Sequence, residues 1–414
     1  MTRPLQAPRL LAGPALAAGA EPFPDHQARL GPLPSWRDGA LIPVLDASGL
    51  SGRGGAGFPV GRKWRAVADA AGDWPVVLVN GAEGEPLSAK DRALMATRPH
   101  LILDGALLAA EAVAAERIIL YVGDAHRAAR AALGRAIVER GPAAQGRFRL
   151  VAAPDRYVAG EESAAVHFID TGDARPVTVP PRPFERGVGG RPTLVQNVET
   201  LAHVALIARY GDAWYRAAGP DAAPGTALVT TSGPGRQTMV HEIDFGETIG
   251  TVGQRLGTQA ADVQAVLIGG YFGGWMAGSR AWSQPLDPLK LREQGVGFGC
   301  GVISFLDHET CGVDVAAQVM GYMAGQSAAQ CGPCVFGLRA IADATLRLAG
   351  GRAQGDDLAR LERWIGQLRG RGACRHPDGA VNHLASAMHV FGDEFRLHQV
   401  RRTCSRRVRA ERIS

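Results

Sequence analysis

A glycine-rich segment near the N-terminus has the composition of an anion-binding loop. Residues Ser51–Gly61 read SGRGGAGFPVG and contain five glycines, with Arg53 inside the segment and Lys63 just after it. Glycine permits positive φ and close backbone approach, so successive N–H groups can converge on an anion. A helix is predicted to follow directly, and its N-terminal partial positive charge would strengthen the site. The segment predicts a phosphate or pyrophosphate site, although a flexible surface loop has the same composition. It lacks the strand and register of a GxGxxG fingerprint.

Three polar segments could line one ligand. Asn80–Pro86 follows the predicted strand Pro75–Val79, and similar compositions occur at Tyr157–Glu162 and Val195–Thr200. Ligands of α/β sheets bind at the carboxyl ends of the strands. The amide of Asn80 offers a donor and an acceptor, which suits a heterocycle edge or a polyol chain. Each segment taken alone is equally compatible with a solvated turn.

Three of the six cysteines have a spacing typical of a metal or redox site. Cys331 and Cys334 are separated by two residues, and Cys374 follows forty residues later. Six cysteines in so long a chain do not make a disulfide scaffold, so clustered cysteines are interpreted as metal or redox ligands. The remaining three, which we expect to be buried or incidental thiols, are Cys300, Cys311 and Cys404.

The composition is that of a folded enzyme. The chain has 414 residues, of which 46% are hydrophobic and 21% charged, and this excludes global disorder. No stretch reaches the roughly 18 uninterrupted apolar residues of a membrane span, which excludes an integral membrane protein. The N-terminal apolar run Leu10–Ala20 contains Pro14 and makes a poor export signal, so a cytoplasmic location is expected.

The positive charge is concentrated at the C-terminus. The net charge is +5, and residues 398–414 contain six arginines and one acid, Glu411, so the rest of the chain is neutral. Such a segment could contact RNA, an anionic lipid surface or an acidic partner. We expect instead a solvated, poorly ordered terminus and no nucleic-acid partner.

The pattern of apolar runs predicts several segments with different architectures. In order, we expect an irregular segment at 1–45, an α/β domain at 46–218, a β-grasp-like module at 226–280, a helical bundle at 305–395 and a basic tail at 398–414. The predicted strands are Pro75–Val79, Arg117–Val122, Arg147–Ala152, Thr226–Thr231, Val240–Ile243 and Ala265–Ile268. The predicted helices are Arg92–Ala115, His126–Arg140, Thr251–Leu256, Val313–Ala324, Val335–Ala349, Asp356–Leu368 and Val381–Phe391.

Together, these motifs resemble one known family. The segments SGRGGAGFPVGRKW, NGAEGEPLSAKDR, YVAGEES, GRPTLVQNVETLAHV and CGPC closely resemble, in this order, the NADH-binding FMN flavoprotein subunit of respiratory complex I. They also resemble its relatives in NAD-linked hydrogenases and formate dehydrogenases. The resemblance runs from about residue 45 to 395. It implies an FMN- and NADH-binding α/β domain, a ubiquitin-like β-grasp (SLBB) domain and a helical bundle carrying a [4Fe-4S] cluster.

The resemblance also implies roles for individual residues. The residues expected around the FMN phosphate are Gly52, Arg53, Gly54, Gly55, Gly57 and Lys63. Those expected around the ribityl chain and ring are Asn80, Glu83, Gly160, Glu161, Glu162, Gln196, Asn197 and Thr200. Those expected along the nicotinamide nucleotide are Phe58, Glu85 and Glu162. The flavin N5 would carry the hydride chemistry, so no catalytic side chain is expected.

The cysteines depart from the family pattern. A complete site has four cysteines, and here Cys331, Cys334 and Cys374 match three positions while Ala328 occupies the fourth. Four thiolates normally hold a [4Fe-4S] cluster. Three could hold a [3Fe-4S] cluster, a four-iron cluster with another ligand, or none, and Cys311 or His376 could supply the missing ligand.

The nucleotide site departs as well. The family usually has Asp at Ala82, an aromatic at Ala66, and a lysine and an aromatic in the stretch that here reads Val179–Arg182. By analogy with base stacking, each lost aromatic face would cost about 1–3 kcal/mol. Arg182 could stack its guanidinium plane instead, or select a 2′-phosphate. FMN binding is therefore better supported by the sequence than NADH binding.

The functional expectation is an FMN-dependent NAD(P)H dehydrogenase that acts as an electron-entry module. It would pass electrons through an iron–sulfur site to a protein partner, either a ferredoxin or an iron–sulfur subunit, and any membrane association would depend on that partner. Two alternatives stay open: a flavoprotein that exchanges electrons with a ferredoxin rather than NADH, and a non-catalytic scaffold subunit.

Overall fold

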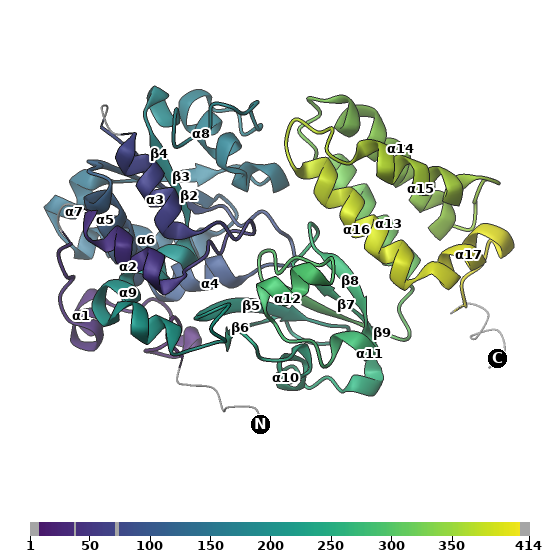
Figure 1. The fold of residues 1–414 in the computed structure, drawn as a ribbon, viewed down its shortest axis with the longest axis horizontal. Coiled ribbons are helices and arrows are strands. Elements are labelled where there is room, and N and C mark those ends of the chain that lie inside the picture. Colours follow the sequence, from purple (N-terminus) through teal and green to yellow (C-terminus); the bar gives the residue numbers. More distant parts are fainter. Residues whose placement is uncertain (1–7, 37–38, 71–73, 406–414) are drawn as a thin grey trace. The chain divides into compact units, whose positions relative to one another are not determined.

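The computed structural model describes residues 8–36, 39–70 and 74–405, and the chain divides into two compact units (Figure 1). The first unit comprises residues 1–230 and 240–247, and the second comprises 231–239 and 248–414. The chain passes between them three times: within strand β5 (Thr226–Ser232), within strand β6 (Met239–Asp244), and between Glu247 and Thr248. Within the described ranges, no helix has both the length and the apolar character needed to cross a membrane.

The first unit is built on a four-stranded parallel sheet in the order β3-β2-β1-β4, which confirms the predicted α/β class. The strands are β1 (Val76–Gly81), β2 (Arg117–Gly123), β3 (Phe148–Ala153) and β4 (Thr193–Asn197). The first three lie where strands were predicted, whereas β4 had been assigned only as part of a polar segment. At the carboxyl end of the sheet, Asn80 of β1 pairs with Tyr121 of β2 and with Asn197 of β4.

Helices cover both faces of this sheet. Alternate residues of a strand point to opposite faces, and in β1 Val77 and Val79 join the core under α2, α5 and α9, whereas Val76 and Leu78 join a smaller core under α8. Burial on both faces explains why the strand sequence is uniformly apolar. The helices of this unit are α1 (Phe23–Leu30), α2 (Leu41–Ser48), α3 (Val60–Asp69), α4 (Lys90–Thr97), α5 (Pro99–Ala112), α6 (Arg127–Glu139), α7 (Pro142–Arg147), α8 (Glu162–Thr171) and α9 (Val198–Arg216).

The single helix predicted over Arg92–Ala115 is wrong, because the structure has two helices there. Arg98, between α4 and α5, has non-helical φ and ψ of −127° and 50°. Proline disfavours the helical conformation in the residue before it and fits the first turn of a new helix. Pro99 therefore ends one helix and begins the next.

The N-terminal segment is also more ordered than predicted. Residues 1–45 contain α1 and the first half of α2, where an irregular lead-in was expected. A proline in the first turn of α1 is compatible with helix initiation. The prediction failed because proline content was interpreted as irregularity.

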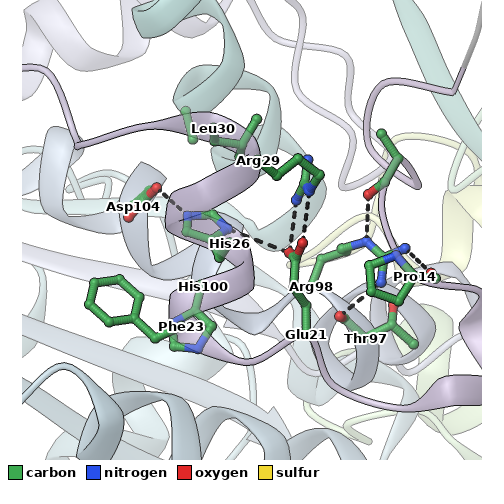
Figure 2. A network of polar contacts seen from close by, with 12 residues as sticks. Pro14, Glu21, Phe23, His26, Arg29, Leu30, Thr97, Arg98, His100 and Asp104 are labelled. Carbon is green, nitrogen blue, oxygen red and sulfur yellow. Dashed lines mark hydrogen bonds and ion pairs between the residues drawn. The ribbon is translucent and has the colours of Figure 1, made fainter.

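Buried ion pairs hold this segment in place (Figure 2). Arg29 donates from Nε and Nη2 to the two carboxylate oxygens of Glu21, at 2.7 and 2.8 Å. The ring of His26 lies between Glu21 and Asp104, with Nε2 2.8 Å from Asp104 Oδ2. Arg98 donates to four backbone carbonyls, three of them in the N-terminal segment. Because buried charges need partners, these contacts fix α1 against α5.

The second unit combines a small antiparallel sheet with a helical bundle. Strand β7 (Val263–Ile268) pairs with β8 (Gly274–Ala277) and with β9 (Val302–Asp307). The helices are α10 (Ile249–Arg255), α11 (Gly278–Ala281), α12 (Pro288–Glu293), α13 (Gly312–Gly325), the π-helix η6 (Pro333–Leu338), α14 (Arg339–Ala349), α15 (Asp357–Leu368), α16 (His376–Val390) and α17 (Gly392–Arg401). Helices α13 to α16 pack in sequence-adjacent pairs as a bundle (Figure 1), as predicted.

The expected basic tail begins later than residue 398. Helix α17 runs to Arg401, and His398 and Cys404 are both buried. Their burial shows that this stretch packs onto the bundle rather than extending into solvent. The remaining arginine-rich residues, 406–414, lie outside the described residues.

Candidate functional site

The carboxyl edge of the parallel sheet contains a topological switch point. The chain runs from β1 outward through β2 to β3, whereas β4 lies on the other side of β1. In open α/β sheets, ligands bind outside the carboxyl ends of the strands where the order reverses. Here that place is between Asn80 and Asn197, which end the two strands in register. Beside them, the buried Oε1 of Gln196 has no hydrogen-bond partner among the described residues. A buried acceptor of this kind normally has a donor, so the edge fits a polar ligand.

The glycine loop lies over this edge. An isolated bridge between Ser51 and Pro59 closes the loop, and α3 follows at once, as predicted. Gly55 and Gly57 have φ of 110° and 64°, which other residues rarely adopt. A Cβ added to Gly54 would lie 3.3 Å from Asn197 Cβ, so the loop backbone approaches the switch point closely. The exposed residues Gly54–Gly57 carry no side chain larger than a methyl group, so they present mainly backbone at the edge of the sheet, and the exposed Phe58 follows them.

Arg53 does not point where the resemblance places it. Its guanidinium Nη2 donates to Tyr215 Oη at 2.9 Å and to the Thr226 carbonyl at 3.0 Å, and its Cζ lies 4.6 Å from the Phe245 ring centroid. Its backbone N–H donates to Thr200 Oγ1 at 2.9 Å. Both Arg53 and Thr200 are buried. They therefore anchor the glycine loop to the interior of the unit.

Three other predicted residues cap helices. The carboxylate of Glu83 accepts from the backbone N–H groups of Asp91 and Arg92, at 2.8 and 2.9 Å, in the first turn of α4. Burial, and secondly the neighbouring Asp91, raise the pKa of Glu83. Asn197 caps α9 in the same way through Oδ1, and Glu161 caps α8 through Oε2. Such caps satisfy N–H groups that a helix leaves unpaired.

A buried charge cluster under the edge was not assigned to the site from the sequence. Lys90 Nζ lies 2.6 Å from Asp91 Oδ1 and 2.8 Å from Glu199 Oε2, and all three residues are buried. Burial opposes the charge on Lys90, but the two carboxylates outweigh it and raise the lysine pKa. Asp91 Oδ2 also accepts from Asn197 Nδ2 at 2.7 Å. The available signal was the rarity of lysine: only three occur in the chain, and Lys90 lies inside one of the conspicuous motifs.

The remaining predicted residues line the accessible side of the edge. Lys63 Nζ lies 2.9 Å from Glu162 Oε2, and both side chains are partly exposed. Phe58 is 50% exposed. Glu85 Oε2 accepts from Tyr157 Oη at 3.1 Å. Phe58 and the pair Lys63–Glu162 can exchange their present contacts for a ligand without uncovering a buried charge, whereas Glu85 is itself buried.

One further pair connects the strand end to the next polar segment. Asn80 Nδ2 donates to the Gly160 carbonyl at 2.8 Å. A Cβ added to Gly160 would lie 3.6 Å from Ala82 Cβ, so the two segments lie side by side. The three polar segments expected to line one ligand thus meet at the carboxyl edge.

Three cysteines of the second unit, Cys331, Cys334 and Cys374, lie close together. Cys334 is buried beside Cys331 and Cys374; burial first, and then these two thiols, raise the pKa of Cys334 to about 12. The hydroxyl of Ser327 hydrogen-bonds to Cys334, and the next residue, Ala328, is buried and has no ligand atom. The arrangement fits three of the four thiolate positions of an iron–sulfur cluster and leaves the fourth to a group other than cysteine.

The two residues considered as replacements have different surroundings. His376 Nε2 lies 2.7 Å from the Met323 carbonyl, to which it donates, so in the neutral ring Nδ1 carries the lone pair and this contact does not exclude His376 as a ligand. Cys311 lies beside Glu394, His398 and Cys404. Of the two residues that could supply the fourth ligand, Cys311 thus belongs to a different cluster.

Comparison with known families agrees with this arrangement. Residues 45–206 match the family model of the Nuo51 FMN-binding domain, and residues 314–398 match that of the NADH-ubiquinone oxidoreductase-F iron–sulfur binding region. Among solved structures, an NAD⁺-reducing [NiFe]-hydrogenase chain superposes with a TM-score of 0.78 at 29% identity. The match covers 95% of this chain but 66% of the length of the hydrogenase chain.

Curated relatives match over most of their length. The chain is 31% identical to the second NADH-quinone oxidoreductase F subunit of Rhizobium meliloti (strain 1021), over 88% of this chain and 90% of the relative. It is 30% identical to the NADH-quinone oxidoreductase F subunit of Escherichia coli (strain K12), over 86% and 83% respectively. The chain therefore belongs to the family of NADH-quinone oxidoreductase F subunits.

Proposed function

We propose that this protein is an NADH-oxidising electron-input subunit that binds FMN at the carboxyl edge of its parallel sheet and passes electrons to a partner protein. The observation that carries the proposal is the glycine loop packed against Asn197 at the switch point, next to the Gln196 acceptor, which has no hydrogen-bond partner in the described part of the chain. Bound FMN would accept hydride from NADH and release electrons singly. The protein's part is to bind and orient the two nucleotides.

The residues divide into those that would contact FMN or NADH and those that position them. The loop backbone at Gly52, Gly54, Gly55 and Gly57, together with the Lys63 ammonium, would hold the phosphate. The amides of Asn80 and Gln196 would meet the ribityl chain or ring. Phe58, Glu85 and Glu162 would line the nicotinamide nucleotide. The residues that hold these groups in place are Arg53, Glu83, Gly160, Glu161, Asn197 and Thr200.

The proposal extends to the domains of the second half of the chain. We assign 226–280 as the β-grasp (SLBB) module and 305–395 as the iron–sulfur domain. The antiparallel strands β7 and β8 and the helix α10 support the first assignment. The converging thiols of Cys331, Cys334 and Cys374 support the second. Strand β9 lies beyond residue 280, so the sheet of the module extends past the predicted boundary.

Among the residues that differ from the family pattern, Arg182 bears on how the electron donor, NADH or NADPH, would be bound. Arg182 is exposed, and its Nη1 lies 3.9 Å from Glu162 Oε1. Its guanidinium could stack on adenine or bind a 2′-phosphate, so we propose that it compensates for the missing aromatic faces. The acceptor would be a ferredoxin or an iron–sulfur subunit, and any membrane association would occur through that partner.

Anaerobic titration of the purified protein with NADH tests the proposal. Flavin absorption that bleaches on addition of NADH is the expected result. Flavin that is present but unaffected by NADH or NADPH would refute NADH oxidation and favour exchange with a ferredoxin. Protein reconstituted with FMN that retains none after gel filtration would refute the proposed binding site.

A further inference from the structure

A second group of potential metal ligands lies in the helical part of the second unit. Ligand atoms of Cys311, Glu394, His398 and Cys404 all lie within 4.8 Å of one another. Three of these side chains are buried, and Glu394 is half-buried. The flavin and iron–sulfur sites described above use none of them.

Separate elements bring the four residues together. Cys311 is the residue immediately before α13. Glu394 and His398 are four residues apart on α17, and such residues lie on one face of a helix. Arg402, with a φ of 52°, ends α17 in the left-handed conformation and reverses the chain, so that Cys404 returns to His398.

The imidazole of His398 is oriented as in a metal site. Its Nδ1 lies 2.9 Å from the Leu348 carbonyl oxygen, which can only accept a hydrogen bond, so Nδ1 carries the proton. In the neutral ring, Nε2 then presents its lone pair 3.5 Å from Cys311 Sγ and 3.4 Å from Glu394 Oε1. Metal-binding histidines almost always donate their second ring N–H to a carbonyl or carboxylate in this way.

The carboxylate and the second thiol are held as well. Glu394 Oε1 accepts from the Ser405 backbone N–H at 2.8 Å. Cys404 hydrogen-bonds to both Glu394 and Cys311. All four ligand groups are therefore preorganised around one point by contacts within the bundle.

We propose that Cys311, Glu394, His398 and Cys404 bind a structural Zn²⁺ ion. Two sulfurs, one imidazole nitrogen and one carboxylate oxygen make the four-coordinate tetrahedral set that zinc takes in structural sites. Thiolate and imidazole favour zinc over Mg²⁺ or Ca²⁺, which prefer oxygen. Four protein ligands leave no open position, so the ion links α17 and the following segment to the start of α13 and takes no part in electron transfer.

Metal analysis of the full-length protein, purified anaerobically from zinc-replete cells, tests this site without any turnover. We expect about one zinc per chain, with two sulfur and two nitrogen or oxygen neighbours in the X-ray absorption spectrum at the zinc edge. Absence of zinc with reduced thiols would overturn the proposal, as would a disulfide between Cys311 and Cys404 in peptide mapping. Zinc surrounded by three or four sulfurs would place it at Cys331, Cys334 and Cys374, and would also overturn it.

Substitution of individual ligands tests whether the zinc ion is bound at these four residues. Cys404→Ser should lower zinc content at least tenfold while flavin content is unchanged, and Cys300→Ser, a cysteine outside the cluster, should keep its zinc. Should Cys404→Ser fail to fold, Glu394→Gln at the half-buried ligand is the milder variant, and we expect it to release zinc to a chelator about tenfold faster. Zinc that is retained with unchanged release in Glu394→Gln would refute the assignment. Because the readout is metal content, failure of this proposal is distinct from failure of NADH oxidation.

Discussion

The proposed FMN site and the proposed iron–sulfur site would hold their cofactors in opposite ways. The first, the flavin edge, is the carboxyl edge of the parallel sheet around Asn80 and Asn197, and the second, the cysteine loop, comprises Cys331, Cys334 and Cys374. At the flavin edge, most polar groups are already paired with one another: Lys90 with Asp91 and Glu199, and Arg53 with Thr226. At the cysteine loop, three thiols converge, and Ala328 stands where the resemblance to the family places a fourth. A cofactor held by many distributed contacts can lose one of them and stay bound, whereas a cluster held by four bonds loses a quarter of its ligands at a single substitution.

The difference explains how one chain can keep an intact flavin edge beside an incomplete cluster site. Among the positions that depart from the family pattern, Arg182 is exposed, Ala66 is partly exposed and Ala82 is buried, and none of them belongs to the charge cluster of Lys90, Asp91 and Glu199. The substitution at Ala328 removes a ligand directly. Departures from a family pattern therefore have to be weighed by what the residue bonds to, rather than by how many positions differ.

The largest expected effect is at the cysteine loop. Ala328→Cys would supply the fourth thiolate, so the purified protein should hold about four iron atoms per chain and give the paramagnetic signal of a reduced [4Fe-4S] cluster. Iron analysis and low-temperature electron paramagnetic resonance measure this. Ala329→Cys adds a thiol at the next, exposed position and should leave the iron content unchanged. About four iron atoms in the unsubstituted protein would show that another group already completes the site.

Beneath the flavin edge, a substitution in the buried charge cluster should lower the stability of the fold rather than remove a single contact with the cofactor. Lys90→Met leaves the buried carboxylates of Asp91 and Glu199 without their cation, which should lower the free energy of unfolding by about 3–5 kcal/mol. Urea unfolding followed by circular dichroism measures the change. Lys290→Met removes an exposed lysine and should unfold like the unsubstituted protein. An unchanged midpoint for Lys90→Met would mean that the network does not support the edge.

Some of these features were predictable from the sequence, and others were not. The apolar runs gave β1 and β2, because strands buried on both faces need continuous apolar sequence. The break at Pro99 was predictable from proline chemistry and was missed. The inward direction of Arg53 was not predictable, because an arginine in a glycine loop has the same sequence whether it meets a phosphate or Tyr215. The burial of His398 was hidden by the arginines around it.

The N-terminal ion pairs around Glu21 are a second buried network, far from the proposed FMN site. Their contribution to the free energy of unfolding can be tested through its dependence on pH. Burial opposes ionisation of Glu21, but hydrogen bonds from Arg29 and His26 outweigh it and lower its pKa from 4.5 to about 2. A lowered pKa stabilises the fold above the unfolded pKa, and this contribution of about 3 kcal/mol is lost as the pH falls from about 5 to 2.

Glu21→Gln should remove most of this pH-dependent term. Urea unfolding at pH 7, 5 and 3 should show a smaller decrease in the free energy of unfolding for the variant than for the unsubstituted protein. Glu116→Gln, at an exposed glutamate, is the matched control and should keep the original slope. An equal slope for Glu21→Gln would mean that the segment is held by its apolar contacts alone.

The smallest expected effect is at the accessible rim, where a single contact to FMN is removed. Lys63 is paired with the partly exposed Glu162 and carries no buried network. Lys63→Ala should therefore fold normally but lose one charged hydrogen bond to the FMN phosphate, worth about 1.5–3 kcal/mol, which corresponds to roughly 10- to 150-fold weaker binding. Flavin fluorescence titration of the apoprotein measures the dissociation constant, with Lys290→Ala as the control.

If FMN is held by many separate contacts, the loss of Lys63 should weaken FMN binding without abolishing it. Lys63→Arg keeps the charge and should recover most of the affinity, since the loop backbone and the amides of Asn80 and Gln196 still hold the rest of the ligand. If Lys63→Ala abolished binding outright, the flavin edge would depend on one contact as strictly as the cysteine loop depends on each thiol, and the contrast between the two regions would fail. If it bound FMN with unchanged affinity, the phosphate would be held by the loop backbone alone, and the assignment of Lys63 to the phosphate would be wrong.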